Sequence, residues 1–147
     1  MRLSIYSVFA ILSTAVFAHP ATEAAPLQAR TNGWAIKNFT RTSSSPSSPV
    51  TYTLILDTYG ALTNCTLTDS TNPAWYHAWY DLPCNKDTGA PYHLSWGWDY
   101  PGDFTVLTVE SFPPSGPRQK VYFGYDHPNA KLPGTVYYPD QGYNAPQ

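Results

Sequence analysis

The chain carries few charges and only two cysteines, and each shortage argues against a class of function. Its 147 residues include 8 Lys or Arg and 10 Asp or Glu, for a net charge of −2 at pH 7. No basic patch is present, which argues against binding to nucleic acid or to an anionic membrane. The two cysteines do not form a Cys-x-x-Cys pair, and they are too few for a zinc site.

Recognisable catalytic motifs are also missing. The sequence has no Gly-x-Ser-x-Gly, and no histidine stands in a recognisable relation to a serine. Asp99, Asp103 and Glu110 could supply the two carboxyls of a glycosidase, but an Asp beside Pro and Gly is ordinary turn chemistry. We therefore predict a protein without enzyme activity, cofactor or metal site. A small extracellular hydrolase is the enzymatic alternative.

The one long apolar run lies at the N-terminus. A basic Met1-Arg2 start precedes the apolar residues 3–17, and small residues for a cleavage site end at Ala18. This pattern predicts a signal peptide at residues 1–18 and a secreted, extracellular protein. No other segment approaches the about 20 apolar residues of a membrane span. Residues 19–30 are rich in Ala and Pro, and we expect them to be a removed pro-segment or, alternatively, a flexible N-terminus.

The remaining residues 31–147 have the composition of one all-β domain. Five Trp, eleven Tyr and four Phe follow Arg30, Pro and Gly recur at short intervals, and no helical period extends beyond two turns. We expect a single small antiparallel β-barrel or sandwich of about seven strands. A period of two places these strands at residues 34–39, 50–57, 61–67, 75–82, 92–100, 104–112 and 120–125. One further short strand at most, residues 135–138, is expected in the Pro-, Gly- and Tyr-rich tail 133–147.

Two covalent features follow from secretion. Cys65 and Cys84 are an even pair in an oxidising compartment, so we expect one intrachain disulfide. It would close a loop of about 20 residues and contribute roughly 3 kcal/mol. The sequons Asn38-Phe-Thr40 and Asn64-Cys-Thr66 are candidate N-glycosylation sites, and unmodified surface asparagines are the alternative.

The aromatic residues of two predicted strands differ in their arrangement. Residues 92–100 place all their large apolar side chains on one face, so this strand is expected to pack a core. The predicted strand 75–82 has aromatics on both faces, and only one face can point into a small barrel. We therefore identify ligand-contact candidates among its aromatics, with cover by the tail as an equal alternative. These candidates are Trp75 and Trp79 on one face, and Tyr76 and Tyr80 on the other.

A spread pattern across residues 25–112 resembles a known family. Its elements are Trp34-x-Ile36-x-x-Phe39, Tyr52-x-Leu54, Cys65, Trp79-Tyr80 before Cys84, the strand from Tyr92 with Ser95 and Asp99, and Leu107-x-Val109. This order is similar to the fungal secreted proteins typified by the allergen Alt a 1. The resemblance implies a compact β-barrel, secretion, no established enzyme activity, and recognition by plants or by the immune system. Some members of that family bind small phenolic ligands, and some bind plant defence proteins.

The chain departs from that family in its cysteines. It lacks the second cysteine pair, expected after Phe112, and the N-terminal cysteine that can bridge two chains. No covalent dimer is therefore expected. Together with this resemblance, the sequence predicts a non-enzymatic protein, and the resemblance implies that it is fungal, allergen-like or effector-like, and binds a host defence protein or a small phenolic molecule. The alternative is a module that binds cell-wall carbohydrate.

Overall fold

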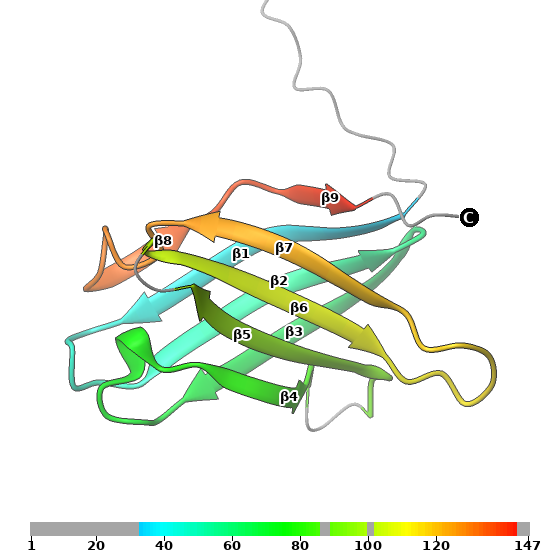
Figure 1. Cartoon of the computed structure of the whole chain (residues 1–147), viewed down its shortest axis with the longest axis horizontal. Coiled ribbons are helices and arrows are strands. Elements are labelled where there is room, and N and C mark those ends of the chain that lie inside the picture. The colour runs from blue at the N-terminus through cyan, green and yellow to red at the C-terminus, as the bar shows by residue number, and fades with distance from the viewer. Residues whose placement is uncertain (1–32, 86–88, 100–101, 144–147) are drawn as a thin grey trace, which may run out of the picture.

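A computed structural model of the chain describes residues 33–85, 89–99 and 102–143 (Figure 1). The predicted signal peptide and pro-segment lie outside these residues. The described part contains nine strands and one short 3-10 helix, and no helix in it is long and apolar enough to cross a membrane. The elements are β1 (Trp34–Ser43), β2 (Val50–Thr58), β3 (Ala61–Asp69), η1 (Ala74–Tyr76), β4 (Trp79–Pro83), β5 (Tyr92–Asp99), β6 (Phe104–Ser111), β7 (Lys120–Asp126), β8 (Gly134–Tyr137) and β9 (Gln141–Tyr143).

The strands form two antiparallel sheets. The first has the order β3-β2-β1-β8, with β9 pairing with the beginning of β1, and the second has the order β4-β5-β6-β7. The sheet edges meet at two seams. Thr66 N–H donates to the Cys84 carbonyl at 3.2 Å on one side, and Gln141 Nε2 donates to the Gly124 carbonyl at 2.7 Å on the other. The predicted antiparallel all-β fold is confirmed, as two separate sheets whose edges meet at these seams.

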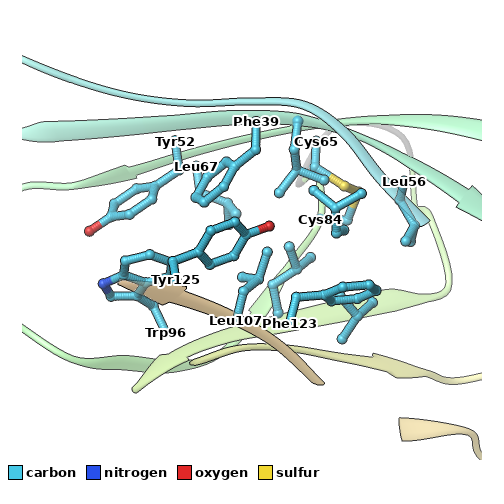
Figure 2. Close-up of a cluster of buried hydrophobic side chains, with 14 of the residues drawn as sticks. Phe39, Tyr52, Leu56, Cys65, Leu67, Cys84, Trp96, Leu107, Phe123 and Tyr125 are labelled. Atoms are coloured by element: carbon cyan, nitrogen blue, oxygen red, sulfur yellow. A yellow bond between two sulfur atoms is a disulfide. The ribbon is translucent and has the colours of Figure 1, made fainter. Parts of the chain in front are cut away.

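The space between the sheets is filled by aromatic and aliphatic side chains (Figure 2). Leu94 and Trp96 on β5 are fully buried, which confirms that this strand packs the core. The predicted disulfide is also confirmed, since Cys65 and Cys84 are bonded and both are buried. It joins β3 of the first sheet to the residue that follows β4 of the second, and therefore holds the sheets together at one edge.

A β-bulge in β1 changes which of its side chains point inward. Trp34 and Ile36 face the core, but the pairing with β2 shifts between Lys37 and Thr40, around Asn38 with its φ of 52°. A bulge adds one residue to a strand and so reverses its alternation. From this point the odd-numbered residues are buried, namely Phe39, Arg41 and Ser43.

Two expected elements differ from the structure. The predicted strand 75–82 is confirmed only in its second half, because the chain forms η1 at Ala74–Tyr76 and becomes a strand at Trp79. The Trp75 carbonyl instead accepts a hydrogen bond from buried Arg41, and the indole of Trp98 donates to the His77 carbonyl. These contacts come from other strands, and local alternation does not reveal them.

The tail contributes two strands where at most one was expected. Both β8 and β9 pair with β1, which makes them part of the first sheet. Tyr138, between them, stacks on Phe39 with ring centroids 4.9 Å apart, and its hydroxyl donates to the Pro128 carbonyl at 2.8 Å. The tail strands therefore pair with the edge of β1 opposite to β2.

Candidate binding surface at η1 and β4

The four aromatic candidates separate into two tryptophans that are buried or partly buried and two tyrosines that are exposed. Tyr76 is 55% exposed and Tyr80 is 67% exposed, whereas Trp79 is only 5% exposed. Trp79 packs edge-on against Tyr52, with ring centroids 5.2 Å apart. The partly buried Trp75 donates its indole N–H to Ser43 Oγ at 3.2 Å. The tryptophans therefore support the fold, and the tail does not cover the two tyrosines.

A third aromatic residue lies beside Tyr76. Trp98 on β5 is partly buried, and its ring centroid lies 5.8 Å from that of Tyr76. Its indole N–H donates to the His77 carbonyl at 3.2 Å, which attaches the chain after η1 to β5. We name Tyr76, Tyr80 and Trp98 the η1–β4 surface. Sequence reasoning assigned Trp98 to the core and did not include it among the candidates.

A buried arginine lies beneath this surface. Arg41 is fully buried, and its guanidinium carbon lies 5.2 Å from the ring centroids of Tyr52 and Trp96 and 5.8 Å from that of Trp98. No carboxylate in the described part of the chain is within ion-pair distance of it. Cation–π contact with desolvated rings partly replaces the missing counter-charge. Burial raises the pKa of the Tyr52 phenol, and the Arg41 charge opposes part of that rise.

The hydrogen bonds of Arg41 fix two loops. Its Nη1 donates to the Pro128 carbonyl at 2.8 Å and to Asn129 Oδ1 at 2.9 Å, in the segment between β7 and β8. Its Nη2 donates to the Trp75 carbonyl at 3.3 Å, and so holds η1 in place. Sequence reasoning missed Arg41 because only the bulge in β1 turns it inward. It positions the segment that carries Tyr76.

Histidine–carboxylate pairs flank the surface. His77 Nδ1 lies 2.8 Å from Asp69 Oδ2, and His93 Nδ1 lies 2.7 Å from Asp81 Oδ1. Burial alone would raise the pKa of Asp69, but hydrogen bonds from Thr71 and His77 outweigh it and hold that pKa below its usual range. The hydroxyl of Ser95 accepts the Asp81 backbone N–H at 3.0 Å. In a catalytic triad the serine hydroxyl instead forms a hydrogen bond with the histidine, so Ser95, Asp81 and His93 are not arranged as a triad.

The carboxylates singled out as glycosidase candidates have other surroundings. Asp103 pairs with His127 at 3.1 Å, and Glu110 pairs with Lys120 at 3.0 Å. Asp99 is exposed at the end of β5. Within residues 33–85, 89–99 and 102–143, no three His, Cys, Asp or Glu side chains are grouped so that they could hold a metal ion.

Both candidate glycosylation sites lie on the first sheet. Asn38 is exposed at the bulge of β1, and its backbone N–H donates to Asp140 Oδ1 at 2.9 Å. Asn64 is exposed on β3, directly before the disulfide-bonded Cys65. Each side chain is therefore accessible to a glycan, and modification of either residue stays a prediction.

Together these features define a class, the small disulfide-linked β-sandwich proteins with an exposed aromatic surface. A family model described as Effector TSP1 matches residues 35–147, which is more than half of the chain. The chain therefore belongs to the TSP1 effector family, and an effector-like role is supported. No curated protein and no solved structure matches the chain. Nothing in these comparisons links it to the Alt a 1 family, so that resemblance stays a prediction.

Proposed function

We propose that this protein is a secreted, non-enzymatic effector that binds a host protein through the η1–β4 surface. The observation that carries the proposal is the exposure of Tyr76 and Tyr80 in a chain of an effector family. Tyrosine is enriched among the residues that dominate protein–protein binding energy, because it offers a large contact area and a polar tip at small entropic cost. Secretion is supported by the N-terminal apolar run and by the disulfide.

The geometry of the surface suits an anchor for a partner. Arg41 and Trp98 fix the backbone on either side of Tyr76 by hydrogen bonds to the carbonyls of Trp75 and His77. A preorganised aromatic side chain loses little freedom on binding, so more of its contact energy appears as affinity. A small phenolic ligand packed against these rings is the second candidate, because Tyr76 and Trp98 already form an aromatic pair, with ring centroids 5.8 Å apart and planes tilted by 43°.

Binding can be tested with a matched set of variants. The immobilised protein captures its partner from an extract of host tissue, and the purified partner is then titrated. A Tyr76→Ala/Tyr80→Ala variant should bind at least thirtyfold more weakly, since interface hot spots cost about 2 kcal/mol or more. Tyr59 is 58% exposed in the turn between β2 and β3, so Tyr59→Ala is the control and should bind like the unmodified chain.

Two results would contradict the proposal. If the double variant binds the partner as tightly as the Tyr59→Ala control, the partner does not contact the η1–β4 surface. If a flavonol quenches tryptophan fluorescence in the unmodified chain but not in the double variant, and no protein partner is captured, a small phenolic molecule is the ligand.

A further inference from the structure

The outer face of the first sheet carries a regular array of threonines. Three neighbouring strands each contain a Thr-x-Thr pair: 40–42 on β1, 51–53 on β2 and 66–68 on β3. The strand register brings these pairs side by side in two cross-strand rows. One row is Thr135, Thr42, Thr51 and Thr68, and the other is Tyr137, Thr40, Thr53 and Thr66. We name these seven threonines the threonine face.

The array is exposed and its side chains are ordered by one another. All seven threonines are exposed or half-exposed. Thr42 and Thr135 share a hydroxyl–hydroxyl bond of 3.3 Å, Thr51 and Thr68 share one of 3.4 Å, and the Thr40 and Thr53 hydroxyls are also bonded. A hydroxyl has one donor hydrogen and two acceptor sites. Each bonded pair therefore keeps one donor hydrogen and acceptor capacity for a ligand.

Strand propensity accounts for single threonines but not for the composition of the two rows. Threonine is a common residue in strands. An ordinary exposed face mixes charges of both signs, yet none of the eight positions in these rows is charged. Outside the rows, Lys37 and Asp57 neutralise each other in an ion pair of 2.6 Å, and the Asp140 carboxylate accepts the Asn38 backbone N–H at 2.9 Å. The threonine face therefore suits a neutral ligand with a repeating pattern of hydroxyl groups.

Tyr137 adds an aromatic ring to the end of one row. Its side chain is 74% exposed, the highest value among the large hydrophobic residues in the described part of the chain. An aromatic ring packs against the apolar face of a flat ligand, and the tyrosine hydroxyl remains in water. A ring followed by three hydroxyl-bearing side chains can bind a sugar chain that lies across the strands.

The spacing of the strands and the twist of the sheet restrict further which kinds of ligand can bind. Neighbouring strands are spaced about 4.8 Å apart, close to the length of one sugar unit in an extended glycan. Neighbouring strands are also rotated by roughly 20–25°, so a rigid crystal surface such as ice loses its match within a few strands. A single flexible chain follows the twist. We infer that the threonine face and Tyr137 form a second binding site, for one chain of a neutral, linear β-linked polysaccharide.

The site is tested by affinity electrophoresis in gels that contain mixed-linkage β-glucan, xyloglucan or laminarin. Enzymatically deglycosylated protein is used, because Asn64 lies on the same face as Thr66. At least one glycan should retard the unmodified chain. Thr51→Val/Thr53→Val preserves side-chain shape and strand propensity and removes two hydroxyls, so it should weaken binding about tenfold. Tyr137→Ala should weaken it by a similar factor.

The control is Tyr80→Ala on the second sheet, which should leave retardation unchanged. Absence of retardation by all three glycans would overturn the proposal. So would equal retardation of the unmodified chain and the Thr→Val variant. A loss confined to Tyr80→Ala would place glycan binding on the η1–β4 surface instead. If the chain shapes growing ice crystals but binds no glycan, the array recognises ice and the proposal fails.

Discussion

Replacing Arg41 tests how a buried cation without a carboxylate partner stabilises this protein. Arg41→Met keeps most of the apolar stem and removes the guanidinium. The loss includes two short hydrogen bonds from a charged donor, at 2.8 and 2.9 Å, worth about 1.5–3 kcal/mol each. It also includes cation–π contacts with Tyr52 and Trp96, worth up to about 2 kcal/mol each when desolvated.

Relief of the desolvation penalty opposes this loss. Burying an ion costs several kcal/mol even after relaxation. The Pro128 carbonyl keeps a donor in Tyr138, but the Trp75 carbonyl loses the one that Arg41 supplies. We expect a net decrease of about 3 kcal/mol in the free energy of unfolding, which for a domain of this size lowers Tm by about 12 °C.

Urea unfolding followed by tryptophan fluorescence measures the change, with an unchanged m-value as evidence of two-state behaviour. Arg118→Met is the control, because the Arg118 side chain is 65% exposed and its contacts with Glu110 and the Phe112 ring should contribute less than about 1 kcal/mol. Hydrogen exchange of residues 74–77 should accelerate in Arg41→Met, since Arg41 holds the Trp75 carbonyl. An unfolding midpoint equal to or above that of the unmodified chain would refute the reasoning, because desolvation would then outweigh the bonds.

Two further stability predictions concern the disulfide and one carboxylate. The Cys65→Ala/Cys84→Ala variant should fold with the same far-UV circular dichroism. Its free energy of unfolding should fall by about 3 kcal/mol, because the bridge spans 19 positions. A decrease below about 1 kcal/mol would contradict this. The Lys37 ammonium, with the Gly60 N–H, holds the pKa of Asp57 below its usual range despite burial. The resulting stability is present above the unfolded pKa of about 3.9 and is lost as pH falls through the folded value. Lys37→Met should therefore destabilise the protein at pH 7, by less than about 1 kcal/mol because Lys37 is partly exposed. The destabilisation should be much smaller at pH 2. An equal loss of stability at both pH values would contradict the assignment.

Some features of this protein are determined locally and are therefore visible in the sequence. The alternation in β5 predicts both the strand and its buried face, because a strand with one side in a core must place apolar residues at every second position. The disulfide follows from two cysteines in a chain with a secretion signal. The predicted strand 75–82 also contains exposed aromatic residues, although only two of its four candidates, Tyr76 and Tyr80, are exposed.

Other features depend on contacts between distant segments. The sequence does not show that Asn38 starts a bulge, and without the bulge Arg41 would point to solvent. Likewise, the local sequence does not show that Trp79 is buried and Tyr80 exposed. It also does not show that η1 takes the place of the first residues of the predicted strand 75–82.

The threonine face shows the same division between sequence and structure. Each Thr-x-Thr pair is plain in the sequence, because two residues in alternation share one face of a strand. Whether the pairs from three strands meet in continuous rows depends on register, and a shift of one residue would turn one set inward. The sequence by itself therefore determined which faces of single strands are polar or apolar. The tertiary structure alone decided which of those faces adjoin, because hydrogen bonding between strands sets register, bulges and sheet order.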